Sequence, residues 1–418
     1  MKRLLKICLF ALLIATGNIS GAYGEEFIYD GITYGYFPNS GGYFVVAATQ
    51  KKLTKDMTSI KIPNKLEYQK DIFKPVREVQ HNAFAGCQYI TEMVLPDTMW
   101  TLNSQAFKDC TNLKTLTLPK TATSIGDYCF YGCVKLKEVT IPGGTSLGNG
   151  LFTGCVNLET VRFQEMTAPV YGQYIFRNCT SLTNVIIPPT YKTNIGKQMF
   201  QGCTRLKSIS IPYSVGIISS SAFQGCTSLK HLNLASQNHT IYDYAFAGCV
   251  SLDTVNLPKQ MVRLYNSVFE GCTGLKHVTI KENMLRIGNS TFKDCSSLSK
   301  ITIPAKVNII EASAFEGCKA LDSVTVLNEE PFAFGADAFK GISPTCVLMV
   351  PYGKRSAYIA AGWTEEVFKG GVKEIIPAGI SQVKVKTKET GWYDLQGRKI
   401  AQPEKGHIYI SGGKKVMK

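Results

Sequence analysis

The sequence predicts a mainly β repeat solenoid of about twelve stacked coils, and three observations support this prediction. Phenylalanine recurs at intervals of 22–24 residues from Phe84 to Phe339. Each of the first eleven of these phenylalanines is followed three residues later by Cys and six residues later by Leu or Ile. A short segment of alternating apolar and polar residues comes next, and in most copies it ends at Pro. Because a unit of about 23 residues cannot bury its own apolar side chains, each coil must stack on its neighbours.

Residues 1–24 have the pattern of a secretory signal peptide. Lys2, Arg3 and Lys6 precede a short apolar run, residues 7–15, and small residues follow. This run is shorter than the roughly 20 residues of a membrane-spanning helix. A buried first helix is the alternative, but it would give the charged start no role. We therefore expect a secreted or cell-surface protein with no transmembrane segment in the mature chain.

Residues 25–78 lack the repeat and are rich in Phe and Tyr. Asp30 and Gly31 are a hairpin-turn signal between apolar stretches, and residues 40–42 are a second one. We expect this region to be an N-terminal β cap that covers the open end of the solenoid. The alternative is a separate binding module.

The repeat region, residues 79–345, has residues suited to a strand, a turn and a buried ring in every coil. The alternating segment predicts a short strand, so stacked coils would form a parallel sheet with one strand per coil. The Gly that usually precedes Cys fits a tight turn, and Pro after the strand ends the ladder. The Phe side chains are expected to stack into a continuous spine, to which the terminal Phe339 contributes less because one neighbour is missing.

Three interpretations of the repeated cysteines are open. We favour a ladder of buried free thiols, each a small apolar plug with a weak S–H donor. Equivalent cysteines in adjacent coils would lie about 4.8 Å apart, wider than the ~3.8 Å between the Cβ atoms of a disulfide. Disulfides are the second interpretation. A metal site is the third, although the repeat spacing brings no set of ligands to one point. No cofactor is expected.

The C-terminal part divides into a cap and a tail. Residues 346–380 are expected to close the solenoid, with a short helix over residues 355–361. Residues 381–418 are expected to form a Lys-rich linker and a small β module. This tail has nine Lys or Arg against three acidic residues, so it carries +6 of the formal charge of +15. A basic tail on a mildly basic body is a weak nucleic-acid signal, and no nucleic-acid partner is expected.

The polar residues of the predicted strands would point outward in two columns dominated by Thr, Ser and Asn. Six charged or bulky residues interrupt this background and are the candidate binding residues: Glu92, Glu138, Arg162, His231, His277 and Lys300. The two histidines would lie two coils apart, too far to share a metal ion. No H-E-x-x-H, G-x-S-x-G or P-loop motif occurs, so no catalytic residues are expected.

The repeated unit, roughly I-x-x-x-A-F-x-G-C-x-x-L-x-x-V-x-I-P, resembles the bacterial BspA-type leucine-rich repeats over residues 79–345. Residues 346–363 are similar to a segment that closes many such solenoids. Residues 392–418 look like a C-terminal module common on secreted proteins of Bacteroidetes-type bacteria, which implies sorting or surface retention; a plain exposed tail is the alternative. The last coil departs from the pattern, with Ile342 in the place of Cys. The resemblance implies a right-handed leucine-rich repeat solenoid.

These observations together predict a non-catalytic, monomeric, secreted or cell-surface protein that mediates macromolecular binding or adhesion. The expected partner is an extracellular protein, which the resemblance implies to be a host protein for some members. The alternative is a carbohydrate-binding or nutrient-scavenging accessory protein, which aromatic residues clustered on a loop edge or on the N-terminal cap would favour. An enzyme would need converging His, Asp and Glu residues that the sequence does not display.

Overall fold

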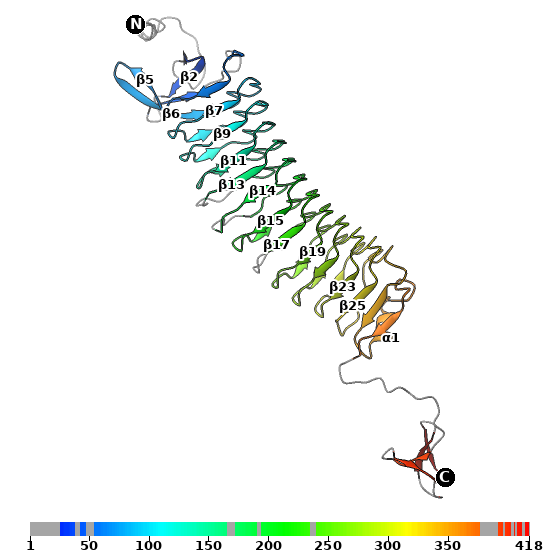
Figure 1. Ribbon diagram of the computed structural model, residues 1–418. Helices are drawn as coiled ribbons and strands as arrows, with labels where there is room; N and C mark the ends of the chain where they lie inside the picture. Colours follow the sequence, from blue (N-terminus) through cyan, green and yellow to red (C-terminus); the bar gives the residue numbers. More distant parts are fainter. Residues whose placement is uncertain are drawn as a thin grey trace. The chain divides into compact units, whose positions relative to one another are not determined.

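The computed structural model has two compact units, which divide between residues 374 and 375. It describes residues 26–37, 42–46, 54–164, 172–189, 194–234 and 240–374 of the repeat unit, and 375–376, 392–395, 398–402, 405, 408–411 and 414–417 of the small unit. The expected signal peptide, residues 1–24, lies outside the described residues, as does most of the linker. In the repeat unit, the coils follow one another in sequence order (Figure 1).

Each coil contributes one strand to a parallel β surface, as predicted from the alternating segment. Among the described residues, these strands form five successive hydrogen-bonded ladders, which we call together the main sheet. In β11 (Glu138–Ile141), the side chains of Glu138 and Thr140 are exposed while those of Val139 and Ile141 are buried. In most of these strands the apolar side faces the core and the polar side faces solvent; Val94 and Ile186 are exposed apolar residues on the outward side. The other strands are β4 (Ser59–Lys61), β7 (Glu92–Val94), β9 (Thr115–Thr117), β13 (Thr160–Phe163), β14 (Asn184–Ile186), β15 (Ser208–Ile211), β17 (His231–Leu234), β19 (Thr254–Asn256), β21 (His277–Thr279), β23 (Lys300–Ile303), β25 (Ser323–Val326), β26 (Val347–Val350) and β27 (Val372–Glu374).

Most coils also contain a second strand of two residues, which corrects the expectation of one strand per coil. Its buried residue is the apolar position five residues before Phe, as in Leu102 and Ile125, and it pairs in parallel with the next coil. The apolar position itself recurs in the sequence, but two residues are too few to display the alternating pattern that predicts a strand. These strands are β8 (Thr101–Leu102), β10 (Ser124–Ile125), β12 (Ser146–Leu147), β16 (Ile217–Ile218), β18 (Thr240–Ile241), β20 (Arg263–Leu264), β22 (Arg286–Ile287) and β24 (Ile309–Ile310).

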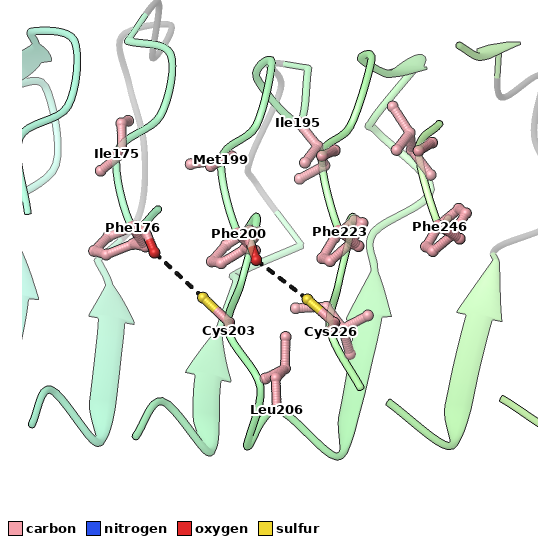
Figure 2. Packing of buried hydrophobic residues seen from close by; sticks show 14 of the residues in the cluster. Ile175, Phe176, Ile195, Met199, Phe200, Cys203, Leu206, Phe223, Cys226 and Phe246 are labelled. Carbon is pink, nitrogen blue, oxygen red and sulfur yellow. Dashed lines mark hydrogen bonds between the residues drawn. The ribbon is translucent and has the colours of Figure 1, made fainter. Parts of the chain in front are cut away.

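The predicted phenylalanine spine is confirmed and runs without a break from Phe84 to Phe339. Consecutive rings stack with centroids 5.1–5.7 Å apart and planes within 1–14° of parallel. The rings are buried, so each fills the centre of its coil and contacts the coils on both sides. Figure 2 shows four of them, Phe176, Phe200, Phe223 and Phe246, in line.

The cysteines form the predicted ladder of buried free thiols. All thirteen cysteines that the structure describes are unpaired and buried. In ten coils, the thiol donates a hydrogen bond to the carbonyl oxygen of the Phe in the preceding coil, at 3.1–3.3 Å. The bonds from Cys203 to Phe176 and from Cys226 to Phe200 appear in Figure 2. Each Phe carbonyl also accepts the backbone N–H of the Cys three residues later in its own coil, as in Phe200 and Cys203. The thiol therefore adds a second hydrogen bond to that carbonyl, and this bond links adjacent coils.

The Phe-containing turn of each coil holds two residues in the left-handed backbone region. One lies two residues after Phe and is Gly in most coils, with φ of 68–76°. Asp109, Asn178 and Asp294 take the same conformation in the other coils. The second lies two residues before Phe and accepts many residue types, including Tyr128 and Ser221. This second position was not predicted, because no single residue type marks it.

The N-terminal strands join the ladder of second strands directly. β1 (Glu26–Tyr29), β2 (Ile32–Phe37) and β3 (Tyr43–Val46) form an antiparallel meander, and Asp30 and Gly31 make the predicted first turn with φ of 51° and 76°. β3 pairs in parallel with the second half of β6 (Ile72–Val79), which pairs in turn with β8, and the first half of β6 pairs in an antiparallel manner with β5 (Lys65–Gln69). The unpaired edge of the first coil is therefore occupied.

The last coil is covered by aromatic residues. The predicted short helix is α1 (Arg355–Ala360), and Trp363 follows it. The Trp363 indole is buried, donates to the Phe332 carbonyl at 2.6 Å, and its ring lies 5.6 Å from that of Phe339. Phe368 lies 5.1 Å from Phe339 on the same side. The expectation that Phe339 lacks a neighbour is therefore wrong, because these rings take the place of the next coil.

The small C-terminal unit is a four-stranded antiparallel sheet in the order β29-β28-β30-β31. Its strands are β28 (Trp392–Tyr393), β29 (Lys399–Ile400), β30 (Ile408–Ser411) and β31 (Lys414–Met417). Asp394 accepts a hydrogen bond from the Arg398 side chain at 2.7 Å and fixes the turn between the first two strands.

Candidate functional site

The six candidate binding residues all lie exposed on the outward side of the main sheet. Their strands are β7, β11, β13, β17, β21 and β23, in the order Glu92, Glu138, Arg162, His231, His277 and Lys300. Because the strands pair in register, residues of successive coils stand directly beside one another in columns. We call this surface the sheet face.

The structure brings only two of the six close together. Glu138 stands beside Thr160, and Arg162 beside Thr140, so Glu138 and Arg162 are diagonal neighbours on adjacent strands. Such a pair lies about 7–8 Å apart, within reach of long side chains. Glu92 accepts a hydrogen bond from Ser59 at 3.2 Å, and His231 and His277 are separated by the strand of Thr254. The six residues therefore mark a long surface and do not converge on a point.

Two adjoining hollows lie on another part of the coils, beside the Phe-containing turns. The first, here called the Tyr174 hollow, has a volume of about 470 Å³. The second, the Asp109 hollow, has a volume of about 540 Å³ and shares the side chains of Tyr128 and Tyr131 with the first. The residues that line them are Gln105, Lys108, Asp109, Tyr128, Tyr131, Thr153, Tyr174, Arg177, Asn178 and Gln198.

These hollows were not predicted from the sequence. Their tyrosines occupy the positions two residues before and one residue after Phe, which the repeat pattern treats as variable. When the coils are aligned at Phe, Tyr128 and Tyr131 fall in the same coil. Tyr174 falls two coils further on, at the same position as Tyr128. The signal was therefore present in the sequence, but only stacking in register gives it meaning.

The buried thiols are unsuited to nucleophilic chemistry. Burial raises the pKa of the Cys155 thiol from 9.0 to about 12, and that of Cys226 likewise. A thiol with such a pKa stays protonated at neutral pH, and the thiolate is the reactive form. Among the described residues, no three His, Cys, Asp or Glu side chains lie close enough together to hold a metal ion. In the same part of the chain, no helix has the length and apolar character needed to cross a membrane.

Comparisons with known proteins agree with this architecture. Residues 77–193 and 193–322, more than half of the chain, match the family described as "BspA type Leucine rich repeat region (6 copies)". A leucine-rich repeat protein from Bacteroides ovatus has 24% sequence identity and a TM-score of 0.52, covering 84% of this chain and 100% of its own. A leucine rich cell surface protein from Faecalibacterium prausnitzii has 20% identity and a TM-score of 0.49, covering 87% and 97%.

The pneumococcal vaccine antigen PcpA is also similar, with 14% identity, a TM-score of 0.47 and coverage of 85% of this chain and 100% of its own. No curated protein matches the chain. The Bacteroides ovatus structure supports the fold, and the family match spans the coils from Phe84 to Phe315. The chain belongs to the BspA-type leucine-rich repeat family.

Proposed function

We propose that this is a non-catalytic, secreted or cell-surface protein that binds an extracellular protein through its sheet face. The observation that carries the proposal is the in-register pairing of the main strands, which aligns outward side chains of neighbouring coils in columns within each ladder. A repeat array of this kind offers an extended surface on which a partner contacts several coils at once.

The charges on the sheet face supply the specificity. Most outward positions are Thr, Ser or Asn, which have no net charge and suit many partners equally well. Glu92 and Glu138 lie near the start of the array, and Lys300 lies near its end. A partner with the complementary order of charges would bind in one direction only, because like charges placed together are unfavourable.

A binding screen followed by charge reversal tests this proposal. The secreted chain would be screened against host extracellular-matrix and mucus proteins and against a glycan array. With a protein ligand in hand, Glu138→Lys and Lys300→Glu should each weaken binding about two- to fivefold, since exposed charge pairs contribute about 0.2–1 kcal/mol. The salt dependence of binding should also become less steep or reverse.

Reversal of Lys414 and Lys415 in the small C-terminal unit is the matched control and should leave binding unchanged. The decisive result is a variant with Thr at all six sheet-face positions. If that variant bound the protein ligand as well as the wild type does, the sheet face would not be the binding surface.

Secretion and surface retention are part of the proposal and have their own test. Residues 1–24 would direct export, and the small C-terminal unit would act in sorting or retention. Fractionation of cells that express the full chain should recover it outside the cytoplasm, and deletion of residues 392–418 should move it from the surface to the medium. Carbohydrate binding is the second candidate function, favoured by the tyrosines of the two hollows.

A further inference from the structure

We propose that the Tyr174 and Asp109 hollows together bind an oligosaccharide. The site is separate from the sheet face, and neither proposal depends on the other. It lies on described residues between Gln105 and Gln198, and its two halves meet at Tyr128 and Tyr131. Volumes of about 470 and 540 Å³ fall in the range of small-molecule sites, about 300–1,000 Å³.

The hollows arise from an irregularity in the repeat. The position two residues before Phe is Ser in four later coils, but it is Tyr128 in one coil and Tyr174 two coils further on. The coil between them has Gly150 at this position, with φ of 61°. A Cβ atom on Gly150 would lie 2.4 Å from Cε1 of Tyr128, so the tyrosine ring occupies the space that a side chain would take. The glycine thus lets Tyr128 lie along the surface between the two hollows.

The tyrosine rings lie in two orientations, and the Lys108 ammonium lies 5.6 Å from the centroid of the Tyr131 ring, over one of its faces. The rings of Tyr128 and Tyr131 meet edge to face, with centroids 6.1 Å apart and planes at 72°. Tyr128 remains 37% exposed, so its ring is available to a ligand. A sugar ring carries C–H groups on its faces, and these pack against an aromatic ring, while the phenol oxygen stays free to exchange hydrogen bonds.

The other lining residues are suited to hydroxyl groups. Asn178, Gln198 and Gln105 each offer both donors and acceptors, Asp109 accepts, and Arg177 donates in a planar fork. Neighbouring hydroxyls on a sugar ring need this combination of donors and acceptors.

Two features of the lining exclude other ligands. It contains no aliphatic side chain, which disfavours a lipid or the apolar centre of a protein interface. Lys108 and Arg177 are its only cations and Asp109 offsets one of them, which disfavours a polyanion. A neutral saccharide is the ligand class that fits.

The size of the site requires a chain of several sugar units. From Phe107 to Phe200, consecutive rings of the spine are 5.2–5.6 Å apart. Gln105 and Gln198 precede these two phenylalanines and are four coils apart, so the hollows extend over about 20 Å along the array. A monosaccharide would fill only part of one hollow, and affinity should therefore rise with chain length until both hollows are occupied.

The test measures binding of the full secreted chain to defined glycans. The probes are neutral polysaccharides (β-glucan, xylan, mannan and galactan), their oligosaccharides from two to six units, and heparin as the polyanion. Affinity electrophoresis would identify the glycan, and calorimetry would measure its affinity against chain length. Tyr128→Ala with Tyr174→Ala should weaken binding about tenfold or more, since each aromatic contact adds about two- to tenfold.

Tyr244→Ala is the matched control. Tyr244 occupies the same repeat position three coils beyond Tyr174, with φ of 57° and 43% exposure, but it lines neither hollow. The control should bind as the wild type does, and Tyr128→Phe should retain most of the affinity because it keeps the ring. Arg177→Gln and Asn178→Ala provide a second pair of variants on exposed side chains, whose loss should also weaken binding.

Three results would overturn the proposal. The first is that no neutral glycan binds. The second is that the double tyrosine variant, folded as judged by its thermal midpoint, binds as tightly as the control. The third is binding of heparin alone, or of a protein alone, through Tyr128 and Tyr174, which would assign the hollows to a different class of ligand. Each result leaves the sheet-face proposal unaffected, because that surface is tested with different variants.

Discussion

Replacement of Phe223 by Ala is the most direct test of how the solenoid is held together. Phe223 is fully buried near the middle of the spine, and its ring stacks on those of Phe200 and Phe246 at 5.3 and 5.2 Å. Because the neighbouring coils are fixed by their own rings and strands, they have little freedom to close the space left by a missing ring.

The expected loss in the free energy of unfolding is about 4–5 kcal/mol. Phe→Ala in a core costs about 3–5 kcal/mol from lost burial and the residual cavity. The upper part of that range applies here because two stacked contacts, each worth about 0.5–1.5 kcal/mol beyond burial, disappear together. Phe339→Ala should cost a similar amount, since Trp363 and Phe368 cover the ring where the next coil would lie.

Guanidinium unfolding followed by circular dichroism measures both quantities. The free energy of unfolding of a repeat array is close to the sum of the stabilities of its coils and of the interfaces between them. A weakened central coil should therefore let the two halves of the array unfold separately. Phe223→Ala should therefore lower the midpoint and broaden or split the transition, with a smaller apparent slope. Phe339→Ala should lower the midpoint without splitting it. Exposed Tyr244→Ala should change stability by less than about 0.5 kcal/mol. Unchanged midpoints for both phenylalanine variants would refute the spine as the source of stability.

Three further predictions concern the same coils. The thiols of the native chain should be unreactive toward a thiol reagent at neutral pH. After unfolding without reductant, close to all of them should react with that reagent. Several disulfides between coils, found by mass spectrometry, would contradict this. Burial raises the pKa of thiols such as Cys155 from 9.0 to about 12, so they ionise first in the unfolded chain. Stability should therefore be independent of these groups below about pH 9 and fall between pH 9 and 12, by about 1.4 kcal/mol per pH unit for each such thiol. A chain equally stable at pH 8 and pH 11 in urea titrations would show that the thiols are not buried in this way. Gly150→Ala should lower the free energy of unfolding by about 1 kcal/mol because of its positive φ, and it should lower saccharide affinity because the added Cβ displaces the Tyr128 ring. Gly154 also has a positive φ but has no side chain close by, so Gly154→Ala should lower stability only. Equal effects of the two variants on affinity would argue against the role given to Gly150.

The features that repeat with one residue type were predictable from the sequence. The phenylalanines from Phe84 to Phe339 have one physical role in every coil, and the cysteines and glycines that follow them have one role each in most coils. The alternating segment predicted the main sheet, and the sequence around Arg355 predicted α1. These features depend on local periodicity, which a single sequence displays.

The features that depend on contacts between coils were not predictable in the same way. The second strand has two residues, and the left-handed position before Phe accepts Asn82, Tyr128 and Ser221 alike, so neither has a pattern within one coil. The hollows need Tyr128, Gly150 and Tyr174 at matching positions in three coils. The cover on Phe339 needs Trp363, a residue 24 positions away and outside the repeat. The position of the candidate residues on the sheet face could be predicted from the sequence, because their spacing follows the strands.

The thiol ladder also bears on how such a protein changes in evolution. A typical inner coil donates a thiol hydrogen bond to the Phe carbonyl of the coil before it, and its own Phe carbonyl accepts one from the thiol of the coil after it. A duplicated coil placed between two others would find the same partners on both sides and need no compensating change. Every insertion would lengthen the array by one ring spacing, 5.1–5.7 Å, and would leave its two covered ends as they are. Gene duplication can thus adjust the length of the repeat array in fixed steps, independently of the residues that select a ligand.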